Sequence, residues 1–366
     1  MSAAKRAVVA MSGGVDSSVA AALMVEAGYE VTGIMLKLWR GEAANSNSGC
    51  CNLGAAEDAR RVADSLGIPF YVLNFAERFE TTVIRNFHRD YAAGRTPNPC
   101  VRCNQWVKFG ALLDRARVLG ADYLVTGHYA RRRENSGRYR LLRGRDVAKD
   151  QSYVLWMLTQ DALSRSLFPI GEMNKSETRR IAADLGLRTA TKPDSQEICF
   201  VREGDTKSYV REHLPEATIE GPIVDASGAV VGRHEGIGHY TVGQRKGLGV
   251  ALGHPVFVTS IDAARNTISV GDRADLEVSA FTADEASFVD EMPSDGTRVY
   301  VQHRAHGDVH VARIHVSGPG RALVEFEQPV VAIAPGQSAA YYSFDDPDEL
   351  LGGGVIRTTV PAAVAV

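Results

Sequence analysis

The spacing of apolar residues changes near residue 200, and this change constrains the fold more than any other feature of the sequence. Before it, helical stretches separate short runs that are apolar over nearly their whole length: RAVVA (6–10), YEVTGIMLKLW (29–39), FYVLNF (70–75) and DYLVTGHYA (122–130). Such runs alternating with helices are typical of a parallel sheet covered by helices on both faces. From about residue 218, short alternating runs are separated by Gly, Asp and Asn turns, the pattern of small antiparallel barrels or sandwiches.

A chain of 366 residues is long enough for two or three domains of roughly 150 residues. A second break in the pattern, near 275–283, divides the β-rich half. We therefore predict an α/β fold made of an N-terminal parallel-sheet domain (1–205), a central small β-rich domain (206–280) and a C-terminal β-barrel domain (281–366).

The formal net charge of −3 gives no general sign of a polyanionic partner. A surface that binds nucleic acid must then be a local cluster of Lys and Arg. No apolar run approaches the length of about 18 residues that suggests a membrane span. The start, MSAAKRAVVAMSGG, lacks the longer apolar core and the cleavage site of a signal peptide. We therefore predict a cytoplasmic protein without a membrane partner.

The segment SGGVDSS (12–18) follows the first predicted strand and opens a helix. Gly13 and Gly14 allow the backbone to turn tightly and to approach an anion closely. The serine hydroxyls and the unpaired N–H groups of the helix N-terminus add donors and a positive dipole end. The segment is neither a Walker A motif nor the GxGxxG fingerprint. It predicts an anion cradle, and the alternative is an ordinary glycine-rich turn.

SGGVDS resembles the signature of the PP-loop ATP pyrophosphatases, which hold the pyrophosphate of ATP and transfer AMP to an oxygen. The resemblance implies an adenine nucleotide alpha hydrolase-like domain that binds ATP and Mg²⁺. Asp16 would orient the metal, Leu36 would pack the adenine, and Gly127 would approach the nucleotide at the carboxyl edge of the sheet. The implied nucleotide-binding residues are Ala10, Met11, Ser12, Gly13, Gly14, Val15, Asp16, Ser17, Leu36 and Gly127.

The cysteine count is odd, which argues against a disulfide framework and leaves catalytic, metal-ligating or buried structural thiols. The cysteines are Cys50, Cys51, Cys100, Cys103 and Cys199. CxxC serves redox chemistry, zinc and iron–sulfur clusters alike. Zinc would want four ligands, and the adjacent Cys50 and Cys51 are poorly arranged for one metal. Arg102 and Lys108 would favour the thiolate of Cys103 if they are also near it in space.

Several ordered motifs resemble the tRNA-specific 2-thiouridylase family, known as MnmA in bacteria and TrmU in mitochondria. These motifs are TPNPxxxCN (96–104), GHYA (127–130), KDQSYVLW (149–156), DSQEICF (194–200), APGQSA (334–339) and LGGGVI (351–356). The likeness covers nearly the whole chain. It implies ATP-dependent 2-thiolation of the wobble uridine through an adenylated uridine, with Cys103 as nucleophile, Cys199 as persulfide carrier, and a disulfide between them as the spent state.

Cys100 departs from the family, because many members carry Asp at this position. Two alternatives follow and are both open. The sulfur is carried as a Cys199 persulfide, or Cys100, Cys103 and Cys199 hold a [4Fe–4S] cluster whose open iron binds hydrosulfide.

The resemblance also implies tRNA contacts. The run 131–149 holds eight lysines and arginines against two acids, and its Glu-Asn-Ser-Gly turn predicts a hairpin that follows an RNA backbone. The loop GHYTVGQRKGLG (238–249) is a further tRNA-facing candidate, or else a glycine-rich loop with a chance basic triplet. Asn98, Pro99 and Cys100 would touch the target base, which has to leave the anticodon stack. The other implied contacts are His128, Lys149, Asp150, Gln151, His303, Arg304 and Gln337.

The family implies the tRNAs for Glu, Gln and Lys as substrates, and a cysteine desulfurase or sulfur-relay protein as sulfur donor. Two other functions are compatible with parts of the sequence. One is another PP-loop AMP-forming ligase or tRNA-modifying enzyme without sulfur transfer. The other is a non-enzymatic RNA-binding or iron–sulfur protein.

Overall fold

The computed structural model describes residues 4–39, 53–194, 198–201 and 205–362. The chain forms two compact units. Unit 1 comprises Met1–Val83, Cys100–Gly204 and Asp348–Leu350, and unit 2 comprises Ile84–Pro99, Asp205–Pro347 and Leu351–Val366. Cys50 and Cys51, for which the sequence predicts no role, lie outside the described residues.

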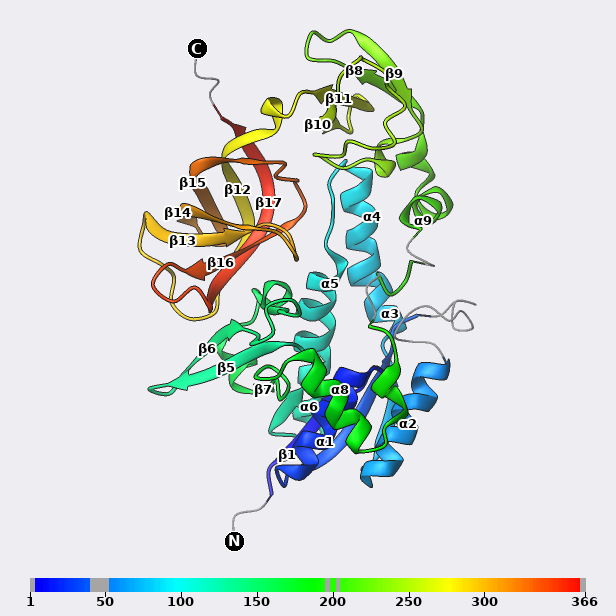
Figure 1. Ribbon diagram of the computed structural model, residues 1–366, viewed down its shortest axis with the longest axis vertical. Helices are drawn as coiled ribbons and strands as arrows, with labels where there is room; N and C mark the ends of the chain where they lie inside the picture. Colours follow the sequence, from blue (N-terminus) through cyan, green and yellow to red (C-terminus); the bar gives the residue numbers. More distant parts are fainter. Residues whose placement is uncertain (1–3, 40–52, 195–197, 202–204, 363–366) are drawn as a thin grey trace. The chain divides into compact units, whose positions relative to one another are not determined.

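Unit 1 is built on a five-stranded sheet in the order β3-β2-β1-β4-β7. Every neighbouring pair in it is parallel, which confirms the predicted α/β fold with a parallel sheet. The strands are β1 (Arg6–Ala10), β2 (Glu30–Lys37), β3 (Phe70–Asn74), β4 (Tyr123–Val125) and β7 (Ser166–Leu167). The helices of unit 1 include α1 (Val15–Glu26), α2 (Leu53–Leu66), α3 (Ala76–Phe79), α6 (Leu113–Val118), α7 (Gln160–Ser164) and α8 (Lys175–Asp184) (Figure 1).

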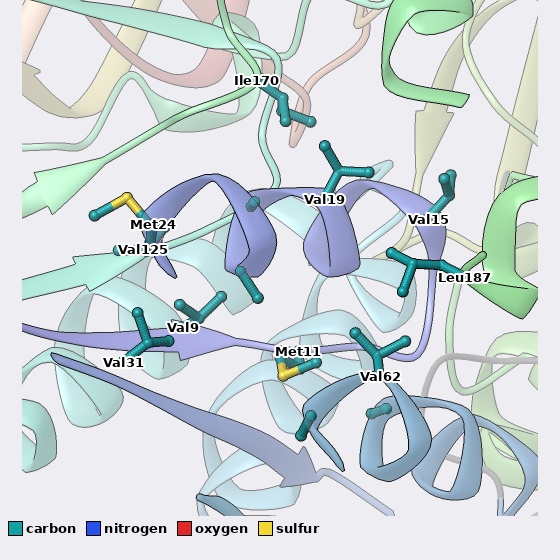
Figure 2. Packing of buried hydrophobic residues seen from close by; sticks show 14 of the residues in the cluster. Val9, Met11, Val15, Val19, Met24, Val31, Val62, Val125, Ile170 and Leu187 are labelled. Atoms are coloured by element: carbon teal, nitrogen blue, oxygen red, sulfur yellow. The ribbon is translucent and has the colours of Figure 1, made fainter. Parts of the chain in front are cut away.

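Helix α1 is buried on nearly all sides. Its sequence, VDSSVAAALMVE, is composed largely of small and apolar residues, as expected for a helix enclosed by other elements. Figure 2 shows Val19 of α1 pointing toward Ile170, Val9 of β1 on the opposite side of the helix, and Val62 of α2 close to Met11. Full burial of an aliphatic side chain of this size contributes about 1.5–3 kcal/mol. The core therefore fixes the start of α1, and with it the loop that joins β1 to α1.

A long helical segment carries the CxxC motif. It begins as α5 (Pro99–Arg102), continues as a π-helix over Cys103–Leu112, and ends as α6. A second π-helical turn covers Glu80–Ile84. π-Helical turns are rare and occur frequently at functional sites. Here the longer stretch begins at Cys103, the predicted nucleophile.

The basic run forms the predicted hairpin. Strands β5 (Ala130–Asn135) and β6 (Arg138–Arg143) pair antiparallel, and β6 also pairs with Glu349 and Leu350. Ser136 and Gly137 turn the chain with positive φ angles of 50° and 76°, the conformation that favours Gly and Asn in tight hairpins.

Unit 2 contains a small four-stranded sheet in the order β10-β11-β8-β9. Its strands are β8 (Gly221–Val224), β9 (Val230–His234), β10 (Phe257–Asp262) and β11 (Thr267–Gly271). Two hairpins supply antiparallel pairs, but β11 runs parallel to β8, whereas the sequence predicted antiparallel strands throughout. The long connection 235–256 accounts for the difference, because parallel neighbours need a crossover of a dozen or more residues.

The last part of unit 2 is a closed six-stranded barrel, which confirms the predicted C-terminal β-barrel. The strand order is β12-β15-β14-β13-β16-β17, and pairing of β12 with β17 closes it. The strands are β12 (Glu277–Phe288), β13 (Thr297–Gln302), β14 (Val309–Gly318), β15 (Arg321–Val331), β16 (Ser338–Ser343) and β17 (Glu349–Pro361). Phe281, Ile314 and Tyr341 are buried in its core.

Unit 2 also holds α4 (Arg85–Ala92) and α9 (Thr206–His213). Across the part of the chain that the structure describes, no helix is long and apolar enough to cross a membrane.

Candidate active site

The loop between β1 and α1 closes on itself through serine and backbone hydrogen bonds. The backbone N–H of Ser12 donates to Ser17 Oγ at 3.1 Å, and the Ser17 and Ser18 hydroxyls donate to the Gly14 carbonyl at 3.2 and 2.8 Å. Gly13 has a φ of 72°, and a Cβ there would lie 2.2 Å from the backbone oxygen of Ala55 on α2. Only glycine fits this position. The loop lies at the N-terminus of a twelve-residue helix.

The predicted nucleotide residues outside the loop lie at the same edge of the sheet. β2, β1 and β4 are neighbours, so Ala10, Leu36 and the segment after Val125 meet at their carboxyl ends, where ligands bind in open α/β sheets. Gly127 packs against the backbone at the start of α1, because a Cβ there would lie 2.7 Å from the Asp16 carbonyl carbon and the Ser17 nitrogen. Gly127 therefore fixes the first turn of α1, and its approach to a nucleotide stays a prediction.

Asp16 is held by two residues that the sequence analysis missed. Lys175 Nζ donates to Asp16 Oδ1 at 2.7 Å and to Oδ2 at 2.8 Å, and the Tyr129 hydroxyl donates to Oδ1 at 2.9 Å. Lys175 is the first residue of α8, whose start is fixed by a capping box between Asn174 and Glu177. Burial raises the pKa of Tyr129 far above its usual value, so its hydroxyl remains a donor at neutral pH.

Asp194 forms the next link of this charge network. It accepts from Lys149 at 2.8 Å and Arg179 at 3.0 Å, and Lys175 Nζ lies 2.8 Å from its Oδ1. Burial by itself would raise the pKa of Asp194, but hydrogen bonds from Lys149 and Lys175 outweigh it and lower the pKa to about 2. Asp194 is therefore an anion at neutral pH, at the start of the DSQEICF motif.

A second lysine reaches the loop itself. Lys192 Nζ donates to the Gly13 carbonyl and to Asp58, each at 2.9 Å. Lys192 lies outside the quoted motifs and 179 residues from Gly13, so nothing in the sequence indicates this contact.

This donor set fits ATP and Mg²⁺. The helix N-terminus, the backbone of the glycine turn and two ammonium groups suit a triphosphate, and Asp16 supplies the kind of carboxylate that Mg²⁺ shares with phosphate oxygens. Asp16 would hold the metal, while Lys175 and Lys192 would face the phosphates.

The donor set for a cluster does not fit. Among the residues that the structure describes, which include Cys100, Cys103 and Cys199, no three His, Cys, Asp or Glu side chains are grouped so as to hold a metal ion. The Cys100–Cys103–Cys199 ligand set therefore gives no reaction step here.

Cys103 is buried at the start of the π-helix, and Cys100 is exposed. The guanidinium of Arg102 lies 4.7 Å from the centre of the Trp106 ring and donates to Gln105 at 2.8 Å. Asn104 Nδ2 donates to the carbonyl of Val154 at 2.9 Å, which ties the TPNPxxxCN motif to KDQSYVLW. The predicted effect of Arg102 on the Cys103 thiolate stays a prediction.

Cys199 is half-buried, and the residue after it anchors its segment. The Phe200 ring stacks on Trp39 at 6.5 Å and meets Phe79 edge-on at 5.7 Å. Unit 1 thus contains the loop 12–18, Cys103 and Cys199 together.

Most implied tRNA contacts in unit 1 make internal contacts. His128 is buried, its Nδ1 is 2.8 Å from Thr126 Oγ1, and burial holds its pKa well below its usual value. Asp150 accepts from the Gly144 backbone at 2.9 Å and pairs with Arg143 at 2.9 Å. The Gln151 side chain accepts from the Tyr129 backbone at 3.0 Å.

The basic hairpin is partly neutralised in the same way. Arg131 pairs with Asp348 at 2.5 Å, Arg140 pairs with Glu349 at 2.7 Å, and Arg132 donates to the Ser164 carbonyl at 2.9 Å. Arg133 is exposed. The hairpin therefore offers RNA fewer cations than its sequence suggested.

In unit 2, Gln337 holds the segment that precedes Asn98. Its Nε2 donates to the carbonyls of Thr96 and Pro97 at 3.0 and 3.3 Å, and the Thr96 N–H donates to Pro335 at 2.9 Å. Gly336 is required here, because its φ is 91° and a Cβ would lie 2.9 Å from Thr96.

The other two barrel residues are also engaged within unit 2. Arg304 donates to the Ala332 carbonyl at 2.8 Å. His303 is buried and stacks on His310, and burial, with Arg304 adding to it, lowers the pKa of His303 to about 4. His303 is therefore neutral at pH 7.

Models of three protein families match the chain one after another. They are described as a tRNA methyl transferase HUP domain (5–203), a tRNA methyl transferase PRC-barrel domain (207–272) and an aminomethyltransferase beta-barrel domain (278–356). The fold and the site thus define a HUP-type nucleotide-binding domain followed by two β domains.

Curated relatives extend this match over nearly the full length. The tRNA-specific 2-thiouridylase MnmA of Moorella thermoacetica is 50% identical over 356 residues, covering 96% of this chain and 99% of the relative. The enzyme of the same name from Roseiflexus sp. is 48% identical over 368 residues, covering 95% and 98%. Among solved structures, a 4-thiouridine synthetase–RNA complex with bound ATP matches 54% of this chain and 45% of its own at 17% identity, with a TM-score of 0.37. The chain belongs to the tRNA-specific 2-thiouridylase family.

Proposed function

We propose that the chain is an ATP-dependent tRNA-uridine 2-sulfurtransferase that acts on the wobble uridine. The observation that carries the proposal is the presence, in one compact unit, of the glycine loop 12–18 with Asp16 and of the two cysteines Cys103 and Cys199. Its full-length relatives at 50% and 48% identity are named for the same activity.

The first half-reaction activates the uridine. ATP would bind the loop 10–17, where Asp16 would hold Mg²⁺, and Lys175 and Lys192, which bind Asp16 and the Gly13 carbonyl, would face the phosphates. The uridine O2 attacks the α-phosphorus, the bond from that phosphorus to the bridging oxygen breaks, and pyrophosphate leaves. A carbonyl oxygen is a poor leaving group, and adenylation converts it into AMP. Two easier steps then replace one difficult displacement.

The second half-reaction delivers sulfur. A donor loads Cys199 with a sulfane sulfur, and the Cys103 thiolate attacks the inner sulfur of that persulfide. A Cys103–Cys199 disulfide forms and hydrosulfide leaves, which attacks C2 of the adenylated uridine and expels AMP. The spent disulfide then needs two electrons from a thiol reductant. In the alternative route a [4Fe–4S] cluster on Cys100, Cys103 and Cys199 would carry the sulfur, although no three such side chains are grouped as metal ligands among the described residues.

Two classes of partner follow. The tRNA is the substrate, with tRNAs for Glu, Gln and Lys as the proposed set, and Asn98, Pro99 and Cys100 placed at the target base. The sulfur donor is a cysteine desulfurase or a sulfur-relay protein. The cytoplasm is the proposed site of action.

The test is thiolation of tRNA in vitro with ATP, Mg²⁺ and a persulfide donor, on anaerobically purified protein with and without iron reconstitution. Mass spectrometry of digested tRNA measures 2-thiouridine. Cys103→Ser and Cys199→Ser should abolish product, while Cys100→Ser should still form product on the persulfide route, because the exposed Cys100 thiol carries no sulfur in it. Product that requires iron and Cys100 would replace the persulfide route with the cluster route. No 2-thiouridine from folded protein with an active donor would overturn the proposal.

A further inference from the structure

An ammonium group occupies the Asp16 oxygens that the proposed Mg²⁺ has to reach. Lys175 Nζ lies 2.7 Å from Oδ1 and 2.8 Å from Oδ2, and its side chain is only 12% exposed. Mg²⁺ requires oxygen ligands at about 2.0–2.1 Å in a nearly octahedral shell. Lys175 and Mg²⁺ therefore compete for the same two oxygens, and the lysine has to give way when the metal binds.

Asp194 is a second carboxylate partner for Lys175. Its Oδ1 lies 2.8 Å from Lys175 Nζ, so one ammonium bridges the two carboxylates. Asp194 is itself fixed, because Lys149 and Arg179 bind it from other elements at 2.8 and 3.0 Å. Because Asp194 is held in place, the Lys175 ammonium can move a short distance away from Asp16 and keep Asp194 as its carboxylate partner.

We propose that Asp194 is a positioning residue for Mg²⁺–ATP binding, which retains the Lys175 ammonium while Asp16 exchanges that ammonium for the metal. The inference rests on the proposed function, because it requires Mg²⁺–ATP at Asp16. With Asn at 194, Lys175 keeps Asp16 as its carboxylate partner, and Mg²⁺ has to break that pair outright. We expect Asp194→Asn to raise the Mg²⁺ concentration at half-saturation of nucleotide binding about tenfold. A tenfold change corresponds in free energy to about one charge-assisted hydrogen bond.

The experiment measures binding rather than turnover. A non-hydrolysable ATP analogue is titrated by calorimetry at a series of Mg²⁺ concentrations, and the Mg²⁺ concentration at half-saturation is compared between variants. The variants are Asp194→Asn, Lys175→Gln, the double variant of the two, and Asp194→Glu. The matched control is Asp184→Asn on the same α8 helix, where the carboxylate forms an exposed pair with Arg180 at 3.6 Å.

We expect Asp194→Asn to raise the half-saturating Mg²⁺ about tenfold, and Asp194→Glu and Asp184→Asn to stay within about threefold of the unmodified protein. In the Lys175→Gln background, the same Asp194→Asn change should have less than about a twofold effect, because the competing ammonium is gone. A purely structural role for Asp194 would give the same effect in both backgrounds.

An equal effect in both backgrounds, or none in either, would overturn the inference and leave the proposed thiolation intact. Absence of any analogue binding by the unmodified protein would overturn the proposed function and this inference together. The two failures are therefore distinguishable.

Discussion

The phosphate loop and the implied tRNA contacts differ in how they are made. The loop 12–18 is closed by hydrogen bonds between its own residues, at positions three to five apart, and distant residues such as Ala55 and Lys192 pack around it. Among the residues implied to contact tRNA, Gln337 binds Thr96, 241 positions away, while the side chains of His128 and Asp150 bind residues two and six positions away that belong to the folded body of unit 1. A motif therefore predicts the geometry of the first region well. In the second, it identifies positions whose side chains also stabilise the fold.

The largest effect on nucleotide affinity is expected at Gly13, where the backbone leaves no room for a side chain. Gly13→Ala places a Cβ against the backbone of α2 at a positive φ, so the loop has to distort. We expect nucleotide affinity to fall by more than about tenfold, from strain of about 1–3 kcal/mol. Calorimetry with an ATP analogue measures the nucleotide affinity. The control is Gly14→Ala, whose Cβ would meet only Ser12 Oγ at 3.4 Å. Equal losses in both variants would contradict the role given to the Gly13 backbone.

A Gln337 variant distinguishes a side chain that stabilises the fold from one that contacts tRNA. Loss of its two bonds to Thr96 and Pro97 should slow thiolation about three- to tenfold while tRNA affinity changes by less than about twofold. Single-turnover rates and filter binding of tRNA measure the two quantities for Gln337→Ala. The control is Gln328→Ala, at an exposed position on β15. Weaker tRNA binding with an unchanged single-turnover rate would make Gln337 an RNA contact instead.

The lowered pKa of His303 predicts that the stability of the barrel falls in acid. Its pKa is about 4 in the fold and about 6.5 in an unfolded chain, so the unfolded chain takes up the proton first as the pH falls. Stability should be complete above about pH 6.5 and fall between pH 6.5 and 4, by at most about 3 kcal/mol. Urea unfolding at pH 7 and 5 should show a smaller loss for His303→Gln than for the unmodified chain. His306→Gln, at an exposed position, should leave the loss unchanged, and a similar reduction there would refute the assignment.

The smallest effect concerns an exposed arginine of the hairpin, Arg133. Arg133→Ala should weaken tRNA binding about two- to fourfold and reduce the salt dependence by about one phosphate contact. Arg131→Ala is the comparison, because this arginine is paired with Asp348 and its loss should lower stability before it lowers RNA affinity. If Arg131→Ala reduces the salt dependence as much as Arg133→Ala, the internal pairing does not divide the hairpin as proposed.

The sequence predicted the features that arise from local patterns. Apolar runs between helices predicted the parallel sheet, and alternating strands predicted the barrel, because each pattern repeats within a few residues. The parallel pairing of β8 with β11 was missed, since it depends on the path of a long connection.

The charge network was missed for a related reason. Lys175 and Asp16 are 159 residues apart, and nothing in the neighbourhood of either residue indicates the other. The arginines of the hairpin showed their charge in the sequence but not their partners, because Asp348 and Glu349 follow some 200 residues later. Pairing over such distances is set by the fold as a whole.

Transfer of the uridine oxygen to AMP is the direct test of uridine activation by adenylation. A tRNA carrying ¹⁸O at C2 of the wobble uridine is incubated with the protein, ATP, Mg²⁺ and a persulfide donor, and both products are analysed by mass spectrometry. The account predicts one ¹⁸O-labelled AMP for each 2-thiouridine formed. Formation of 2-thiouridine with unlabelled AMP, or without AMP, would contradict activation of the uridine by adenylation.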